Sequence, residues 1–273
     1  MSETAAQPFL ATPLARATGV ARIADLGRRT LVMGILNATP DSFSDGGRFA
    51  DLDRALDQAR RMIDEGADIV DVGGESTRPG HEAVSAEDEQ RRVLPVIAEL
   101  AKTSPVAISI DTYKASTAAA ALAAGATIVN DVWGLMRDPD MARVVAEHRA
   151  PVIVMHNREA ADPSLDTIAD QLGFFRRSID RALAAGVREE DVIVDPGIGF
   201  GKTFEQNLET LARLGELAVL GRPILLGTSR KRMIGAILDL PPDERLFGTL
   251  ATNVAGILAG AAIVRVHDVR PHV

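Results

Sequence analysis

Residues 53–74, DRALDQARRMIDEGADIVDVGG, contain the unit from which we derive the fold. Residues 53–67 carry apolar side chains at helical spacing, and they include Gly66, a residue type that readily ends a helix. The run 68–74 is apolar with little alternation, which is typical of a strand covered on both faces. We therefore predict a helix that returns the chain to a parallel sheet.

Apolar runs of strand length recur along the whole chain. They are LVMGILN (31–37), DIVDVGG (68–74), VAISIDT (106–112), TIVNDVW (127–133), PVIVMH (151–156), VIVDPG (192–197), PILLGTS (223–229) and IVRVHD (263–268). Helical patterns separate them, and glycines at 66, 125 and 186 precede three of them. Eight such units predict one α/β domain, a closed (β/α)8 TIM barrel, with an open doubly wound sheet as the alternative.

The predicted barrel occupies residues 31–273, and residues 1–30 form an N-terminal arm. Only residues 269–273 follow the eighth strand, so we expect the eighth helix to be missing or truncated at the C-terminus. No second composition pattern indicates a further domain.

Composition excludes several classes of protein. The net charge of −8 and the pI of about 5.2 argue against a nucleic-acid partner, because phosphate backbones are held by clustered positive charge. No apolar run is long enough to span a membrane, and no secretory leader is recognisable, so we expect a cytoplasmic protein. The chain has no cysteine, which excludes disulfides, thiolate metal ligands and a cysteine nucleophile.

Polar groups end nearly every predicted strand. They are Asn37, Glu75 to Arg78, Asp111, Asn130 with Asp131, His156, Asp195, Ser229 to Lys231, Arg265 and His267. In a (β/α)8 barrel this end of the strands forms the catalytic face. Arg265 and His267 lie in one apolar strand and point the same way, and an inward cation is costly unless it meets an anion. The ring of polar groups therefore predicts a site for an anionic small molecule.

Three loops at this face have unusual sequences. Residues 37–47 and 73–80 mix glycine and proline with charged and hydroxyl groups, as loops that close over a ligand do. Residues 195–202, DPGIGFGK, lack the spacing of a dinucleotide loop or a P-loop, and we expect them to form the tight turn that places Asp195.

These segments together resemble one enzyme family. NATPDSFSDGG (37–47), GGESTRPG (73–80), SIDTYK (109–114), NDV (130–132), MH (155–156), DPGIGFGK (195–202), GTSRK (227–231) and RVHDV (265–269) are similar, in this order, to the signatures of dihydropteroate synthases. The resemblance runs from about residue 31 to the end. It implies a transferase of folate biosynthesis that condenses 6-hydroxymethyl-7,8-dihydropterin diphosphate with p-aminobenzoate to give 7,8-dihydropteroate and diphosphate.

The resemblance also implies roles for individual residues. The pterin would be bound by Asp111, Asn130, Asp195, Lys231 and Arg265. The diphosphate would be bound by Asn37, Arg265 and His267, and Asn37 would ligate Mg²⁺. The p-aminobenzoate, with which sulfonamides would compete, would be bound by Thr39, Pro40, Phe43, Thr77, Arg78, Pro79 and Ser229. The catalytic groups would be Phe43, Asp45, Arg78 and Lys231, and the family resemblance implies a homodimer.

Three other functions remain open. A pterin-dependent methyltransferase of the same barrel fold would need no diphosphate site, and the loop 37–47 and the pair Arg265 and His267 count against it. A non-catalytic pterin-binding paralogue would not need Asp45 and Arg78, which are both present. A hydrolytic metal site of His156, His267, Asp111 and Asp195 lacks the usual histidine spacing, so contact with substrate is the favoured interpretation.

Overall fold

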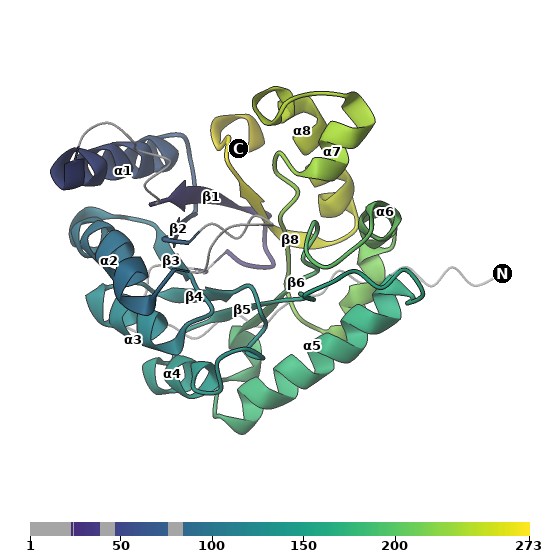
Figure 1. Ribbon diagram of the computed structural model, residues 1–273, viewed down its shortest axis with the longest axis horizontal. Coiled ribbons are helices and arrows are strands. Elements are labelled where there is room, and N and C mark those ends of the chain that lie inside the picture. The colour runs from purple at the N-terminus through teal and green to yellow at the C-terminus, as the bar shows by residue number, and fades with distance from the viewer. Residues whose placement is uncertain (1–22, 24, 39–46, 76–83) are drawn as a thin grey trace.

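The computed structural model describes residues 23, 25–38, 47–75 and 84–273. Eight parallel strands form a closed barrel, in which each strand pairs with the next and the last pairs with the first (Figure 1). The strands are β1 (Leu31–Asn37), β2 (Ile69–Gly73), β3 (Ala107–Asp111), β4 (Ile128–Asp131), β5 (Val152–Met155), β6 (Val192–Asp195), β7 (Ile224–Leu226) and β8 (Ala261–Val266). The predicted TIM barrel is confirmed, and the alternative of an open sheet is wrong because β1 is hydrogen-bonded to β8.

Helices surround the barrel (Figure 1). They are α1 (Gly47–Asp64), α2 (Ala86–Thr103), α3 (Ala115–Ala124), α4 (Met141–His148), α5 (Thr167–Ala184), α6 (Phe204–Ala212), α7 (Arg232–Leu238) and α8 (Leu246–Leu258). Gly66, Gly125 and Gly186 all have positive φ angles just after a helix, as the sequence predicts. Because α7 and α8 both precede β8, only the short 3₁₀ turn η5 (Arg270–His272) follows the last strand, as expected.

The strands alternate between two apolar layers. Outward side chains pack under the helices in a large cluster that includes Val70, Ile108 and Val194. Inward side chains at the amino ends of the strands form a second cluster, which includes Ile69, Ile128 and Ile263. Ile23 and Leu26, from the predicted arm, belong to this inner cluster, so the end of the arm packs beneath the barrel. The carboxyl end of the barrel interior is therefore the part left for polar side chains.

The outer face where β8 meets β1 has its own small cluster. Val264 and Val266 of β8 pack there with Met62 of α1 and with Val269, which is fully buried. The few residues after β8 thus cover part of the surface that a full helix would cover in a complete barrel. Within the described residues, no helix has the length and apolar content needed to cross a bilayer.

Candidate active site

The barrel interior turns polar one layer above the inner apolar cluster. Ile69, Ala107, Ile128, Ile193 and Ile263 all belong to that cluster. Side chains alternate along a strand, so the residues two positions further on also point inward. They are Asp71, Ser109, Asn130, Asp195 and Arg265. Asn130, Asp195 and Arg265 of the predicted polar ring therefore point into the barrel near its carboxyl mouth, together with Asp71 and Ser109, which were not predicted.

Arg265 is the cation at the centre of one half of this mouth. Its Nε donates to Asp71 Oδ2 at 2.6 Å, and its Nη2 donates to Asp111 Oδ2 at 2.6 Å. Burial alone would lower the pKa of Arg265, but Asp71 and Asp111 outweigh it and raise that pKa. The carboxylates of Asp71 and Asp111 thus supply the negative charge that an inward-facing arginine requires.

Asp71 connects Arg265 with another site residue. The same Oδ2 atom accepts a hydrogen bond from Asn130 Nδ2 at 3.1 Å. Asp71 is fully buried and its Oδ1 has no hydrogen-bond partner among the described residues, which leaves room for a donor from a ligand or water. Asp71 Oδ2 therefore binds both Arg265 and Asn130, two residues that we predicted to contact the pterin and that come from opposite parts of the barrel.

Asp111, at the end of β3, has an unusual acidity. Burial raises the pKa of its carboxyl group to about 7, and the negative charges of Asp71, Glu89 and Asp131 act in the same direction, whereas Arg265 opposes the shift. Asp111 therefore exchanges a proton near neutral pH, as carboxyl groups in binding sites often do.

Asp195, at the end of β6, is held by its own loop. Its Oδ1 accepts a hydrogen bond from the Gly197 N–H at 2.8 Å, and no cation of the described residues forms an ion pair with it. Burial raises its pKa, while Lys231 and the Gly197 hydrogen bond lower it. The predicted tight turn is confirmed, because Gly197, Gly199 and Gly201 all have positive φ angles. The second carboxylate oxygen remains available to a ligand.

Lys231 lies on the other side of the same loop. Its Nζ donates to the carbonyl oxygen of Ile198 and lies 4.6 Å from the centre of the Phe200 ring. Burial lowers the pKa of Lys231 to about 8, although Asp195 favours the charged form. Lys231 thus interacts electrostatically with Asp195 without forming an ion pair with it.

Two further predicted residues meet at the rim. The Ser229 hydroxyl oxygen accepts the backbone N–H of His267 at 3.1 Å and lies 2.9 Å from His267 Nδ1. Asn37 ends β1 and is half-buried at the mouth. The remaining predicted residues, Thr39, Pro40, Phe43, Asp45, Thr77, Arg78 and Pro79, lie outside the described residues.

Asp71 is a site residue that the sequence pattern did not lead us to predict. Arg265 stands out because a charge is costly inside an apolar strand, and the same reasoning applies to the aspartate in Ile69-Val-Asp-Val72. A search for a second charged residue within the apolar runs would have found the partner of Arg265.

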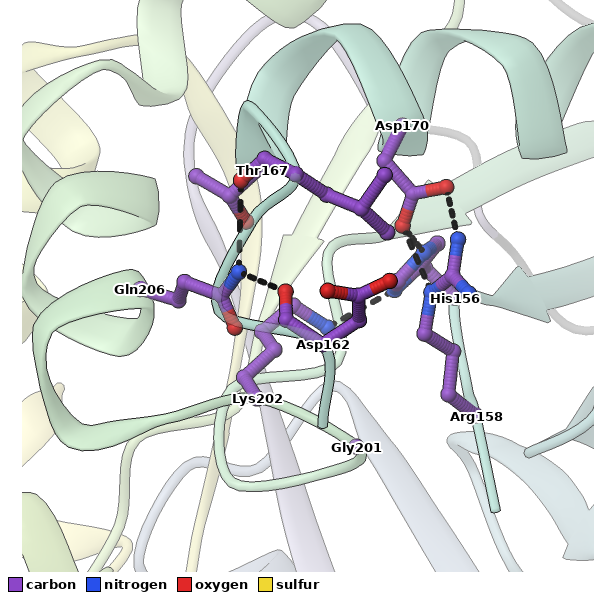
Figure 2. A pocket seen from close by; sticks show the side chains of 9 residues that line it. His156, Arg158, Asp162, Thr167, Asp170, Gly201, Lys202 and Gln206 are labelled. Atoms are coloured by element: carbon purple, nitrogen blue, oxygen red, sulfur yellow. Dashed lines mark hydrogen bonds and ion pairs between the residues drawn. The ribbon is translucent and has the colours of Figure 1, made fainter. Parts of the chain in front are cut away.

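A further polar cluster lies beside the glycine loop, at the ends of β5 and β6, and joins the predicted His156 to Arg158 and Asp170, which were not predicted (Figure 2). His156 Nε2 lies 2.9 Å from Asp170 Oδ2, and His156 Nδ1 lies 2.7 Å from Lys202 Nζ. Arg158 donates to both carboxylate oxygens of Asp170. Asp170 is on α5, far along the chain from Lys202, so only the fold brings them together.

The structure argues against the hydrolytic metal site. His156 is bound to Asp170 and Lys202, whereas His267 is bound to Ser229, so the two imidazoles serve different networks. Among the described residues, no three acidic or histidine side chains gather in a way that could hold a metal ion.

Known proteins resemble this chain over most of its length. Residues 33–267 match the family described as pterin binding enzyme. A dihydropteroate synthase of Bacillus subtilis (strain 168) is 55% identical over 242 residues, which cover 89% of this chain and 85% of that protein.

Solved structures agree with the sequence comparison. A dihydropteroate synthase from Clostridium difficile, solved in the presence of pteroic acid, has a TM-score of 0.89 and 55% identity, with 90% of this chain and 94% of the other covered. A Yersinia pestis dihydropteroate synthase in a sulfonamide drug complex has a TM-score of 0.83 and 43% identity, covering 89% and 90% of the two chains.

Proposed function

This chain belongs to the dihydropteroate synthases of the pterin-binding enzyme family, and we propose that the mouth of its barrel carries out their reaction. The reaction joins 6-hydroxymethyl-7,8-dihydropterin diphosphate to p-aminobenzoate and releases diphosphate. The observation that carries the assignment of the site is the geometry of Asp195, a buried carboxylate with one oxygen bound to its own loop and the other open.

The pterin binds between the two halves of the polar layer. Its amino-pyrimidine edge presents neighbouring N–H donors, which a carboxylate accepts in bidentate fashion, and Asp195 is that carboxylate. Asn130 and Asp111 lie on the opposite side of the mouth, and Lys231 contributes a positive charge beside the pterin carbonyl. These assignments rest on burial and on the open hydrogen-bonding positions just described.

The diphosphate binds above this layer, near β8 and β1. Arg265 uses Nε and Nη2 for Asp71 and Asp111, which leaves Nη1 to donate to a phosphate oxygen, while the face of the planar guanidinium group can stack on the pterin. Asn37 ends β1 and His267 follows β8, and these two strands are neighbours, so both residues lie at the same part of the rim.

A magnesium ion fits this part of the site. The carboxamide oxygen of Asn37 is a hard oxygen ligand, and Mg²⁺ often takes only one or two protein ligands when phosphate oxygens supply others. Asn37 would hold the ion, which when bound would neutralise charge on the departing diphosphate.

The chemical step needs stabilisation of charge more than a strong base. The bond between the pterin methylene carbon and the diphosphate oxygen breaks, and Arg265 and His267 stabilise the leaving group. The neutral arylamine nitrogen of p-aminobenzoate forms the new bond to the same carbon and then loses a proton. Ser229 at the rim and Thr39, Pro40, Phe43, Asp45, Thr77, Arg78 and Pro79 of the two loops complete the p-aminobenzoate site, where sulfonamides compete.

The direct test is an assay of the purified protein. We expect p-aminobenzoate and the pterin diphosphate, incubated with the protein and Mg²⁺, to yield dihydropteroate, detected by mass spectrometry. The matched control replaces the diphosphate ester by 6-hydroxymethyl-dihydropterin, which has no leaving group. No product from the ester would contradict the assignment and favour the non-catalytic paralogue. Methyl transfer from a methyl-tetrahydropterin to a corrinoid would favour the methyltransferase.

A homodimer fits the surface of the last two helices. Phe247, Val254 and Leu258 of α8 are 81%, 56% and 84% exposed, and Ile237 of α7 is 58% exposed. Apolar patches of this kind are usually covered by a partner, and a second copy of the chain is the partner that the family resemblance implies. We expect sedimentation equilibrium to give a dimer and Phe247→Glu to give a monomer. A wild-type monomer would contradict the proposal.

The cytoplasmic location stays a prediction.

A further inference from the structure

The loop after β6 carries two groups that face the pterin site, and both depend on how the loop is held. Asp195 begins the loop, and the ring of Phe200 lies beside Lys231. Three of the residues between Asp195 and Thr203 have positive φ angles, so local sequence preferences hold the loop only weakly. Contacts from outside the loop must therefore fix its shape.

Lys202 is itself part of the loop, and its side chain folds back to link the loop to His156 at the end of β5. Its Nζ donates to the carbonyl oxygen of Gly197 at 3.0 Å and to that of Phe200 at 3.2 Å, and it lies 2.7 Å from His156 Nδ1 (Figure 2 shows Lys202 beside His156). An ammonium group has three N–H donors, and here each has one acceptor. Lys202 is thus joined to the two residues of the loop that flank its turn.

The group that receives the third hydrogen bond is itself fixed. Burial lowers the pKa of His156 to about 3, and Lys202 and Arg158 add to the effect, so the imidazole is neutral at neutral pH. Its Nε2–H then donates to Asp170, and Nδ1 is left as the acceptor for Lys202. Arg158 holds Asp170 in place with two hydrogen bonds.

The backbone of the loop packs closely against the same segment. A Cβ atom added at Gly197 would overlap the carbonyl oxygen of His156, and one added at Gly201 would overlap Arg158. The His156 N–H also donates to the Asp195 carbonyl oxygen at 2.9 Å. The loop backbone therefore packs against the end of β5, and Lys202 adds hydrogen bonds between the loop and His156.

We infer that Lys202 is a positioning residue for the pterin half of the site. Its ammonium group, held by the chain His156–Asp170–Arg158, fixes the glycine loop so that Asp195 and Phe200 meet the pterin. The hydrogen bonds of Lys202 lie at the ends of β5 and β6, whereas Ser229, which we assign to p-aminobenzoate, is bound to His267 beside β8. This role rests on the dihydropteroate synthase function proposed above and adds to it a residue that acts through others.

The charge of Lys202 depends on its surroundings. Burial lowers its pKa to about 7, and Lys231 and Arg158 act in the same direction, whereas Asp195 and Asp170 favour the charged form. His156, the remaining titratable neighbour, stays neutral in this range. A neutral amine has only two N–H donors, so one of the three hydrogen bonds is lost as the pH rises above about 7.

The test compares steady-state kinetics of the full-length protein with Lys202→Met, which keeps the length of the side chain and removes the ammonium group. We expect the KM for the pterin diphosphate to rise about tenfold, while the KM for p-aminobenzoate stays within about twofold, because only one half of the site is loosened. Lys102→Met is the matched control, since Lys102 is exposed on α2, where it pairs with Glu99 of the same helix. A pterin KM within twofold of wild type would overturn the inference.

A second variant tests the charge without removing it. Lys202→Arg stays cationic, so we expect a pterin KM within about threefold of wild type at pH 7. In the wild type this KM should begin to rise near pH 7, and in Lys202→Arg only near pH 8, where Lys231 titrates. An unshifted onset would overturn the inference even if Lys202→Met failed to fold. Wild-type protein that makes no dihydropteroate would refute the function itself, which is a different result.

Discussion

Asp111 and Asp195 end strands on opposite sides of the same barrel and are held in different ways. Asp111 forms an ion pair with Arg265 from β8, and Arg265 is also held by Asp71. Asp195 has no such partner among the described residues and is fixed by the N–H of Gly197 in its own loop. One carboxylate is thus positioned by side chains from distant strands, and the other by local backbone. Each carboxylate uses one oxygen in this way, so the two differ in what positions them, a charged side chain or the backbone.

The largest effect should come from the open carboxylate. In Asp195→Asn one oxygen becomes an N–H group that faces the pterin donors, and such an unpaired buried group costs about 2–4 kcal/mol, or about 30- to 1000-fold in kcat/KM. Calorimetry with a pterin analogue should show a matching loss of affinity. The exposed Asp140→Asn serves as control. Wild-type affinity in Asp195→Asn would show that Asp195 does not bind the pterin.

The difference between backbone and side-chain positioning can be tested with two glycines. Gly197→Ala places a Cβ against the His156 carbonyl oxygen at a φ angle of 64°, and we expect a loss of at least about 1–3 kcal/mol in the free energy of unfolding. Gly73→Ala, beside Asp111, meets its nearest atom, Asp111 Cβ, at 3.6 Å, so a change below about 1 kcal/mol is expected. Urea denaturation measures both. Equal losses in the free energy of unfolding for the two variants would mean that the backbone at Gly197 is no more constrained than that at Gly73.

Asp71 and Asp111 should be energetically coupled, because both carboxylates bind Arg265. Asp71→Asn and Asp111→Asn each remove one carboxylate from Arg265, so their effects on the free energy of unfolding should deviate from additivity by about 0.5–3 kcal/mol. Asp71→Asn combined with Asp191→Asn is the control pair, because Asp191 binds Arg188 elsewhere. Additive effects in the first pair would mean that Arg265 does not link the two carboxylates.

The smallest effect expected is a shift of a pH profile. Burial raises the pKa of Asp111 to about 7, so the carboxylate that we propose as a pterin contact forms only as the pH rises through that value. We expect kcat/KM for the pterin diphosphate to increase between pH 5 and 7. Asp71→Asn removes a neighbouring negative charge that raises the Asp111 pKa, so this increase should move to lower pH. A rising limb at the same pH in both proteins would exclude Asp111 as its source.

The fold and the positions of the strand-end polar groups could be predicted from the sequence alone. Continuous apolar runs fix which segments are strands, because buried parallel strands need apolar side chains on both faces. Eight strands bring their carboxyl ends to one mouth, and that is why Asn37, Asp111, Asn130, Asp195 and Arg265 could be named in advance. The glycine caps at 66, 125 and 186 were also readable, since each reflects a local backbone requirement.

The pairing of polar side chains from distant parts of the chain could be seen only in the folded structure. Arg265 could have met a ligand or a protein carboxylate, and its pairing with Asp71 joins residues that are 194 positions apart. The chain from Lys202 through His156 to Asp170 likewise joins a loop, a strand end and a helix. Strand patterns carry a period of two and therefore show which face a side chain occupies, but the distance between side chains across a barrel depends on closure and register. Those are properties of all eight strands together, and no single segment of the sequence contains them.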